Sequence, residues 1–326
     1  MRAVQCTQPG EAPVLAVAEL PSPPLGPGQI RVAVHAAGIN FADLLLVQGK
    51  YQEKPAPPFT PGMELAGTVV ELGSDVSGFT PGDRVMAVAH LGGYADEAVV
   101  DAALAYRIPE TMSFDAAAGF PIVYGTAHGG LTWRARLKPG ETLLVNAAAG
   151  GVGLAAVEIG RLLGAKVIGT ASTEEKLAIA RQHGADHALL SGAPDLVDRI
   201  RAITGRGGVD VAFDPVGGPM FEACLRTIAW EGRIVIVGFA GGVVQQIPSN
   251  VALVKNCDVI GFFWGSYRTR DPARLRESLE AALAWVADGR LTPHVSATFS
   301  LEQVTEAFAA LSSRRSTGKL VLTTGR

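Results

Sequence analysis

The residues most able to do chemistry in this 326-residue chain form a glycine-rich turn. The sequence Ala148-Ala149-Gly150-Gly151-Val152-Gly153 follows the apolar run 143–145 and precedes the helix-like stretch 154–159. Between a strand and a helix, such glycines let the backbone approach a pyrophosphate, and the helix start offers free N–H groups and the positive end of its dipole. We therefore predict a dinucleotide site at Ala149, Gly150, Gly151, Val152 and Gly153, although Ala148 replaces the first glycine of the G-x-G-x-x-G pattern.

The end of the next predicted strand, 166–171, indicates which dinucleotide binds. An Asp or Glu at this point would bind the ribose of NAD, but Ser172 and Thr173 stand there, followed by Lys176. Hydroxyls and a lysine suit the dianionic 2′-phosphate of NADP, which a carboxylate would repel. Helix capping by Ser172, Thr173 and Glu175 is an alternative explanation, but it does not account for the missing carboxylate. We expect NADPH as the cofactor, with Ser172 and Lys176 at its 2′-phosphate.

The elements around this turn alternate between strand and helix from about residue 123. Strands are predicted at 142–147, 166–171, 187–190, 209–214, 233–239 and 258–263, and helices between them include 173–183, 194–204 and 220–229. This order predicts an α/β fold with a Rossmann-type, doubly wound parallel sheet. Four glycines are expected just past helix ends in the left-handed conformation: Gly164, Gly184, Gly205 and Gly232.

The first part of the chain has a different pattern. Short strands broken by Pro and Gly are predicted at 30–36, 64–72, 84–88 and 94–100. After about residue 266 we predict a helix at 272–288, a strand at 295–299, a helix at 301–311 and a strand at 318–323. We expect this tail to return to the first domain. The predicted domains are therefore a discontinuous β-rich catalytic domain, 1–122 with 266–326, and an NADP-binding domain, 123–265.

Composition excludes several classes of function. The formal net charge is −3 and Lys and Arg form no stripe, which disfavours nucleic-acid binding. No uncharged run reaches membrane-spanning length, and the chain start has no signal-peptide pattern. The three cysteines are far apart in the sequence, which is typical of a reducing compartment and of neither a disulfide framework nor a zinc knot. We expect a cytoplasmic protein.

Several motifs in order resemble those of the medium-chain dehydrogenase/reductase superfamily, and its zinc-independent quinone oxidoreductase branch, which includes zeta-crystallin, most of all. These motifs are Gly38-Ile-Asn-Phe-Ala-Asp43, Pro61-Gly-Met-Glu64, Phe79-x-Pro-Gly-Asp-Arg-Val85, Gly92-Gly-Tyr-Ala95 and the glycine turn. The resemblance implies that the β-rich domain is GroES-like. Zinc alcohol dehydrogenases carry Cys where Asn40 stands and His where Met63 stands, so only Glu64 of that metal site remains. Because zinc prefers thiolate, imidazole and carboxylate ligands, we expect no metal.

The resemblance also implies roles for residues of both domains. Asn40 and Asp43 match positions near the nicotinamide, and Tyr51 matches a tyrosine that lines the cofactor and substrate cleft. Asp43 could instead cap a helix or turn, and Tyr51 could be a tyrosine at the edge of the core. Cofactor contacts are implied for Thr126, for Gly238, Phe239 and Ala240 after the fifth strand, and for Phe262, Phe263 and Trp264 after the sixth, where packing is the alternative.

Two further residues have no settled role, and of these only Lys319 matches a family motif. Tyr124 lies at the predicted domain junction and could simply pack. Lys319, in Gly318-Lys319-Leu320, could reach the cleft, but we expect a solvated strand lysine.

Without a metal, the reaction must be one that hydride transfer can largely carry alone. Quinones and similar conjugated carbonyls fit, and we expect an NADPH-dependent quinone oxidoreductase acting on a small molecule. One alternative is reduction of an activated C=C bond in an alkenal, an enone, or an acryloyl or enoyl thioester. Another is an NADPH-binding protein with little turnover. The resemblance implies a homodimer formed through the sixth strands.

Overall fold

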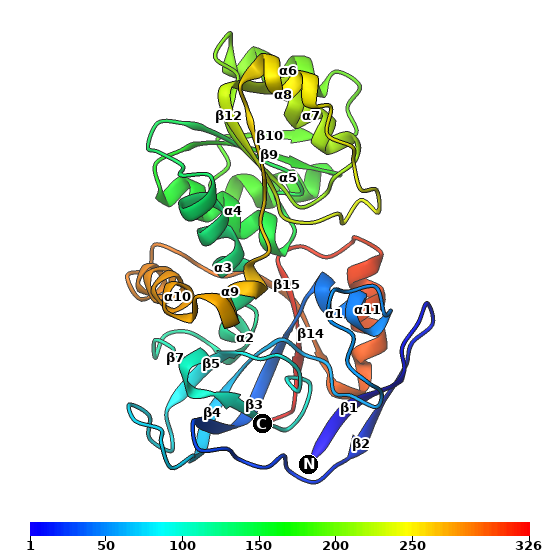
Figure 1. The fold of residues 1–326 in the computed structure, drawn as a ribbon, viewed down its shortest axis with the longest axis vertical. Coiled ribbons are helices and arrows are strands. Elements are labelled where there is room, and N and C mark those ends of the chain that lie inside the picture. Colours follow the sequence, from blue (N-terminus) through cyan, green and yellow to red (C-terminus); the bar gives the residue numbers. More distant parts are fainter. The chain divides into compact units, whose positions relative to one another are not determined.

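The computed structural model describes residues 1–326 and divides the chain into two compact units. Unit 1 comprises Met1–Ile122 and Arg268–Arg326, and unit 2 comprises Val123–Tyr267. Unit 2 contains a parallel sheet with helices, whereas unit 1 is rich in antiparallel strands (Figure 1). The predicted fold class is therefore confirmed.

Unit 2 is organised around a six-stranded sheet in which every neighbouring pair is parallel. The strands are β8 (Thr142–Val145), β9 (Lys166–Ala171), β10 (His187–Leu190), β11 (Val209–Asp214), β12 (Ile228–Ile236) and β13 (Asp258–Gly261). Their order in the sheet is β10-β9-β8-β11-β12-β13. The order reverses between β8 and β11, and ligands of open α/β sheets bind at such a switch point, beyond the carboxyl ends of the strands.

Helices precede, connect and follow these strands, and several form a group in the upper part of Figure 1. They are α3 (Pro121–Gly129), a π-helical turn (Gly130–Arg134), α4 (Gly151–Leu162), α5 (Glu174–Gln182), α6 (Leu196–Thr204), α7 (Pro219–Thr227), α8 (Ser249–Lys255), a 3-10 turn (Trp264–Ser266) and α9 (Tyr267–Arg270). The core between sheet and helices includes Leu144, Ile168, Ile200, Phe221 and Ile234, all fully buried. The chain pattern did not predict α8, because none of its residues is buried and it has no apolar stripe.

The left-handed glycines were predicted correctly at three of four positions. Gly164, Gly184 and Gly205 follow helix ends with φ values of 82°, 109° and 61°. The prediction for Gly232 is wrong, because this residue lies inside β12, where Glu231 has the positive φ of 57°. Strand β12 begins directly after α7, with a register shift against β11. Between Ile228 and Arg233, β12 advances five residues while β11 advances two, so an irregularity in the strand, not a helix cap, turns the chain there.

Unit 1 contains a larger, mostly antiparallel sheet with the order β14-β15-β3-β4-β5-β7, in which β6 also pairs with β3. These strands are β3 (Gln29–Ile39), β4 (Glu64–Leu72), β5 (Arg84–Val88), β6 (Glu97–Asp101), β7 (Ala105–Arg107), β14 (Val295–Ser300) and β15 (Lys319–Thr323). A two-stranded sheet pairs β1 (Arg2–Gln8) with β2 (Val14–Glu19). Strand β15 pairs with β3, which brings the end of the chain beside residues 36–39.

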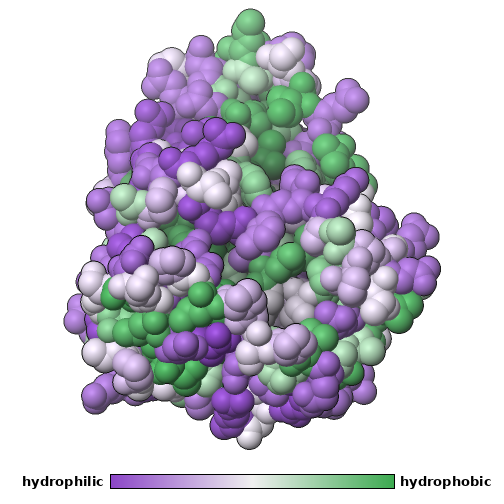
Figure 2. Space-filling view, turned by 60° about the horizontal axis from the view of Figure 1, so that its bottom comes forward, coloured by the Kyte–Doolittle hydropathy of each residue, from purple (hydrophilic) through white to green (hydrophobic).

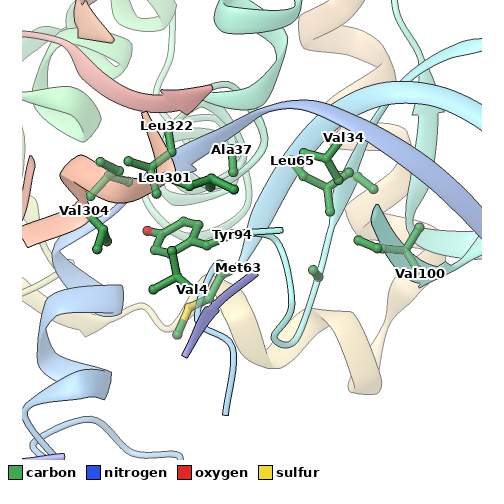
Figure 3. Close-up of a cluster of buried hydrophobic side chains, with 14 of the residues drawn as sticks. Val4, Val34, Ala37, Met63, Leu65, Tyr94, Val100, Leu301, Val304 and Leu322 are labelled. Atoms are coloured by element: carbon green, nitrogen blue, oxygen red, sulfur yellow. The ribbon is translucent and has the colours of Figure 1, made fainter. Parts of the chain in front are cut away.

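Helices of unit 1 cover this sheet and its ends. They are α1 (Phe41–Val47), a 3-10 turn (Ala102–Leu104), α2 (Phe114–Ala118), α10 (Pro272–Ala287), a 3-10 turn (Leu301–Gln303) and α11 (Val304–Ser312). The core joins strands from both ends of the chain, and Figure 3 shows Met63 lying beside Val4 and Tyr94 in it. None of the helices in either unit is both long and apolar enough to cross a membrane.

The packing of α4 on the glycine turn generates a prediction. A Cβ atom at Gly153 would lie far inside van der Waals contact of the Ala147 carbonyl oxygen, which is backbone and cannot move aside cheaply. We expect Gly153→Ala to destabilise the protein by about 2 kcal/mol or more, measured by urea unfolding without cofactor. Gly192→Ala is the matched control, because no atom lies within 4 Å of its added Cβ. Equal stabilities of the two variants would contradict this account.

Candidate functional site

The glycine turn of unit 2 leaves backbone donors without partners. Gly150 is the N-cap of α4 and offers no capping side chain. The first bond of the helix runs from the Leu154 N–H to the Gly150 carbonyl, at 2.7 Å, so the N–H groups of Gly151, Val152 and Gly153 precede the regular ladder. These groups and the helix dipole together suit a phosphate.

Space for such a phosphate exists at Gly150. A Cβ built on this residue would meet only the Ala147 carbonyl oxygen, at 3.4 Å, and is otherwise in the open. A residue with a side chain would fill this cradle, whereas glycine leaves the backbone accessible. The structure therefore has the local features that a pyrophosphate needs at Gly150–Gly153.

A buried polar network holds the turn in place. The Asn146 side chain, directly after β8, donates to Asp214 Oδ1 at 3.0 Å and accepts from the Thr170 hydroxyl at 3.0 Å. Asp214 also accepts from the backbone N–H groups of Val216 and Gly217. Burial raises the pKa of the Asp214 carboxyl, and these hydrogen bonds oppose the shift. The network connects the ends of β8, β9 and β11, and no sequence pattern predicts it because its members are far apart in the chain.

The end of β9 carries the residues expected at the 2′-phosphate. Ser172 is exposed directly after the strand, and Thr173 caps α5 by accepting from the Lys176 N–H at 3.4 Å. Burial lowers the pKa of the half-buried Lys176 ammonium. Thr173 therefore does cap the helix, as in the alternative explanation, and the Ser172 side chain takes no part in this cap.

The remaining cofactor residues predicted in unit 2 follow the last two strands or lie on α3. Gly238, Phe239 and Ala240 come after β12, at the same edge as the glycine turn, since all strands are parallel. After β13, Phe262 packs against Trp133 and Tyr267 with ring centroids 6.2 and 5.9 Å apart.

One donor in this region, the indole N–H of Trp264, has no acceptor within the chain. Trp264 is buried, and its indole Nε1 has no hydrogen-bond partner. Gly125 on α3 makes room for this ring, because a Cβ there would collide with it. Thr126, the next residue, is also buried. Phe263, in contrast, is exposed.

Tyr124 on α3 does more than pack. Its hydroxyl donates to Glu158 Oε2 at 2.6 Å, and the other carboxylate oxygen lies 2.8 Å from Nδ1 of His183. Burial and the neighbouring Glu158 carboxylate raise the pKa of Tyr124 well above its usual value. The three side chains connect α3, α4 and the end of α5.

In unit 1, Asn40 and Asp43 lie at the start of α1. Asn40 is the N-cap, and Asp43 Oδ2 accepts from its backbone N–H at 2.9 Å, one half of a capping box. The expected alternative for Asp43, a capping residue, is therefore part of its role. Both side chains are buried.

The Lys319 side chain lies beside Asn40, buried to 5% exposure. Its ammonium donates to the Ile39 carbonyl at 2.7 Å, to Asn40 Oδ1 at 2.7 Å and to Glu64 Oε1 at 2.8 Å. The expectation of a solvated lysine is wrong, because the pairing of β15 with β3 points this residue into the interior. Gly119 makes room for it, since an added Cβ would lie 3.0 Å from Lys319 Cβ.

Glu64 completes this cluster. Its Oε1 also accepts from Asn40 Nδ2 at 2.8 Å, and its Oε2 accepts from the Ile122 N–H at 2.8 Å. Gly38 has no side chain because a Cβ there would collide with the Glu64 carboxylate. Asn40, Glu64 and Lys319 thus form one connected buried network.

This arrangement does not fit a zinc ion. Asn40 Oδ1 and Glu64 Oε1 face the Lys319 ammonium, which already supplies a cation, and Glu64 Oε2 is occupied by the Ile122 N–H. Met63 offers a thioether within the hydrophobic core, as Figure 3 shows. Carboxamide and thioether groups are also poor zinc ligands.

Asp43 is fully buried near this network, and its Oδ1 has no hydrogen-bond partner. The nearby Tyr94 hydroxyl directs its weak bond to the Gly38 carbonyl, at 3.5 Å. Burial raises the pKa of Asp43 to about 6, although the bond from Asn40 and the charge of Lys319 oppose the shift.

Tyr51 lies on the loop after α1, half-buried against the core. Burial, with the charges of Glu53 and Asp43, raises the pKa of its hydroxyl to about 12. The loop is held by Glu53, which contacts Arg268 at 3.1 Å and Nδ1 of His90 at 2.9 Å. Tyr51 is thus a neutral donor at physiological pH.

The Asp43 environment predicts a pH dependence of stability. Its pKa is about 6 in the folded chain and about 3.9 in unfolded chains, so stability from the neutral acid is complete below pH 4 and is lost as the pH rises through 6. We expect Asp43→Asn to be more stable than the natural chain at pH 8, by up to about 3 kcal/mol, and equally stable at pH 4. Urea unfolding at several pH values measures this.

The control for this prediction is Asp75→Asn, which changes an exposed carboxyl group. It should leave the pH dependence as it is. An Asp43→Asn variant with the same pH profile as the natural chain would show that the buried carboxyl does not titrate in this range.

Comparisons with known proteins agree with these two units. Residues 26–110 match the family model described as alcohol dehydrogenase GroES-like domain, and residues 151–288 match the one described as zinc-binding dehydrogenase. The chain is 46% identical over 326 residues to quinone oxidoreductase-like protein 2 homolog of Nematostella vectensis, covering 99% of this chain and 89% of that protein. Identity to human quinone oxidoreductase is 32% over 325 residues, covering 99% and 97%.

Comparison with solved structures also finds oxidoreductases. Escherichia coli quinone oxidoreductase complexed with NADPH superposes with a TM-score of 0.90 at 31% identity, covering 99% of this chain and all of that one (100%). The CurK enoyl reductase superposes with a TM-score of 0.89 at 26% identity, covering 99% and 98%. On these sequence identities and coverages, the chain belongs to the quinone oxidoreductase branch of the medium-chain dehydrogenase/reductase superfamily.

Proposed function

We propose that this protein is an NADPH-dependent, metal-free oxidoreductase that transfers hydride to a quinone or a similar conjugated carbonyl compound. The observation that carries the proposal is the uncapped start of α4 at the switch point of the sheet. The neighbouring strand end, where Ser172 stands in place of a carboxylate, favours NADPH. The E. coli relative that was solved with NADPH supports this choice.

The residues of unit 2 would hold the cofactor as follows. The N–H groups of Gly151–Gly153 and the backbone of Ala149 and Gly150 bind the pyrophosphate, and Ser172 and Lys176 bind the 2′-phosphate. Nearer the nicotinamide we place Thr126, the backbone of 238–240, and residues 262–264. The unpartnered indole N–H of Trp264 supports this last assignment, because a buried donor without an acceptor is costly.

Bound NADPH supplies the hydride, and unit 1 acts on the acceptor. A conjugated acceptor places the incoming negative charge on its oxygen, so it needs hydrogen-bond donors and no Lewis acid. We assign this role to Asn40 and Tyr51. Asp43 fixes the Asn40 backbone by accepting its N–H. It also places a second carboxyl group, besides that of Glu64, near the site. The Lys319 ammonium contributes the positive charge that a metal would otherwise bring.

The second candidate is reduction of an activated C=C bond in an alkenal, an enone or an enoyl thioester. The similarity to the CurK enoyl reductase favours it, because that protein shares the whole fold. Both candidates use the same hydride and differ in the acceptor.

We also propose that the protein is cytoplasmic and forms homodimers through β13. This strand is the last in its sheet, so one edge of it has no neighbour within the chain. The segment between β12 and β13 exposes the apolar side chains of Val243, Val244, Ile247, Leu253 and Val254. Figure 2 shows hydrophobic residues among the polar ones on one face of the surface. The three cysteines are buried and free, which suits a reducing compartment.

Steady-state oxidation of NADPH with 1,4-benzoquinone, an ortho-quinone, an enone and acryloyl-CoA tests the function. We expect turnover with the quinones. Turnover with only the enone or the thioester would establish the second candidate. Tight NADPH binding without turnover on any acceptor would contradict both and indicate a binding protein.

Cofactor choice can be tested at Lys176. Because the added carboxylate would repel the 2′-phosphate, Lys176→Glu should raise the Kd for NADPH by on the order of 100-fold and change that for NADH by no more than about threefold. Tryptophan fluorescence titration measures both constants. The matched control is Lys166→Glu, at the opposite end of β9. Equal losses of affinity for the two cofactors would refute the role of Lys176.

A further inference from the structure

The Lys319 ammonium cannot act on a ligand directly, because its hydrogen bonds are already used. An ammonium group has three N–H donors, and Ile39, Asn40 and Glu64 supply three acceptors within 2.8 Å. The side chain is buried, with 5% exposure. Any effect of this charge on a reaction must therefore pass through one of its partners.

Asn40 is the partner through which the charge can act. Lysine can only donate, so the Asn40 carbonyl oxygen must face Lys319, and its amide nitrogen must face the Glu64 carboxylate. The amide therefore has one orientation. Its nitrogen carries two hydrogens, and Glu64 is its one acceptor within the chain, at 2.8 Å. One N–H of Asn40 remains available.

We propose that Lys319 is a positioning residue that polarises Asn40, so that the remaining N–H of Asn40 becomes the donor to the acceptor's carbonyl oxygen during hydride transfer. The inference rests on the function proposed above. A charged donor on the amide oxygen draws electron density from the amide nitrogen, and the N–H on that nitrogen becomes a stronger donor. In a buried site such a charge is weakly screened.

The reaction then balances without a metal. The hydride, two electrons and one proton, would come from bound NADPH, which would leave as NADP⁺, and would form a C–H bond at the conjugated carbon of the acceptor. The C=C π pair then shifts to the adjacent C–C bond, the carbonyl π pair moves to the oxygen, and the Asn40 N–H stabilises this charge while keeping its hydrogen. A proton from water finally neutralises the oxygen. Asn40 is the catalytic residue in this step, and Lys319 acts through it.

A double-mutant cycle tests whether the two residues act together. We expect Asn40→Ala and Lys319→Met each to lower kcat with 1,4-benzoquinone by about 10- to 100-fold, with NADPH affinity unchanged. Because Lys319 acts through Asn40, the double variant should lose no more than about twofold beyond Asn40→Ala. Losses that multiply would show a separate, structural role for Lys319 and overturn the proposal, as would an unchanged kcat in a folded Lys319→Met variant.

Loss of the ammonium leaves the Glu64 carboxylate as an unpaired buried charge, which destabilises the fold. A second variant therefore removes both charges. Lys319→Met with Glu64→Gln removes both charges and should show the same loss of kcat as Lys319→Met. Lys166→Met, an exposed strand lysine, is the matched control and should leave kcat unchanged. Full activity of the neutral pair would overturn the proposal.

Polarisation of Asn40 is also measurable without cofactor or substrate. The chain has four asparagines, Asn40, Asn146, Asn250 and Asn256, so selective 15N labelling gives four pairs of side-chain signals. Compared with Glu64→Gln alone, we expect Lys319→Met with Glu64→Gln to move the Asn40 signals upfield and to leave the Asn250 signals in place. Unmoved Asn40 signals would overturn the inference. A natural chain that binds NADPH but reduces no quinone would instead overturn the proposed function, while this shift still tests the polarisation.

Discussion

The β-rich unit depends on one buried ion pair, between the Lys319 ammonium and the Glu64 carboxylate. Charges removed from water are costly unless every donor and acceptor is satisfied. Here the Ile39 carbonyl, the Asn40 amide and the Ile122 N–H complete the set, so that β15, β4, the end of β3 and the start of α3 meet at one point. The glycines at 38 and 119 provide the space. The same bonds fix the orientation of Asn40, which makes the structural pair part of the proposed chemistry.

In unit 2, by contrast, backbone N–H groups at the start of α4 are left without partners. The N-terminus of α4 has no capping side chain, while the buried side chains of Asn146 and Asp214 hold the strand ends around it. Because this turn is already rigid, binding of an anion to its unpartnered N–H groups costs little conformational entropy. In the function that we propose, unit 2 presents open donors to the cofactor phosphates, and the buried ammonium of unit 1 takes the place of a metal ion.

The sequence predicted the features that depend on local pattern. The bounds of β9, β10 and β11 agree with the predicted strands, because buried parallel strands are short apolar runs between helices. Gly232 was misplaced because the strand after α7 begins without a loop, which no glycine rule detects. Lys319 was misjudged for a different reason: a lysine near the end of a chain looks solvated until the pairing of β15 with β3 places it beside Glu64, 255 residues away. Roles for Asn40, Asp43 and Tyr51 rest on the resemblance and remain predictions.

We propose that an internal ammonium, and no metal, organises the site. Turnover of NADPH and 1,4-benzoquinone before and after exhaustive dialysis against a strong chelator, with metal content measured on the same samples, tests this. We expect unchanged kcat in protein that contains far less than one metal ion per chain. Loss of activity on chelation, with recovery when Zn²⁺ is restored, would contradict it.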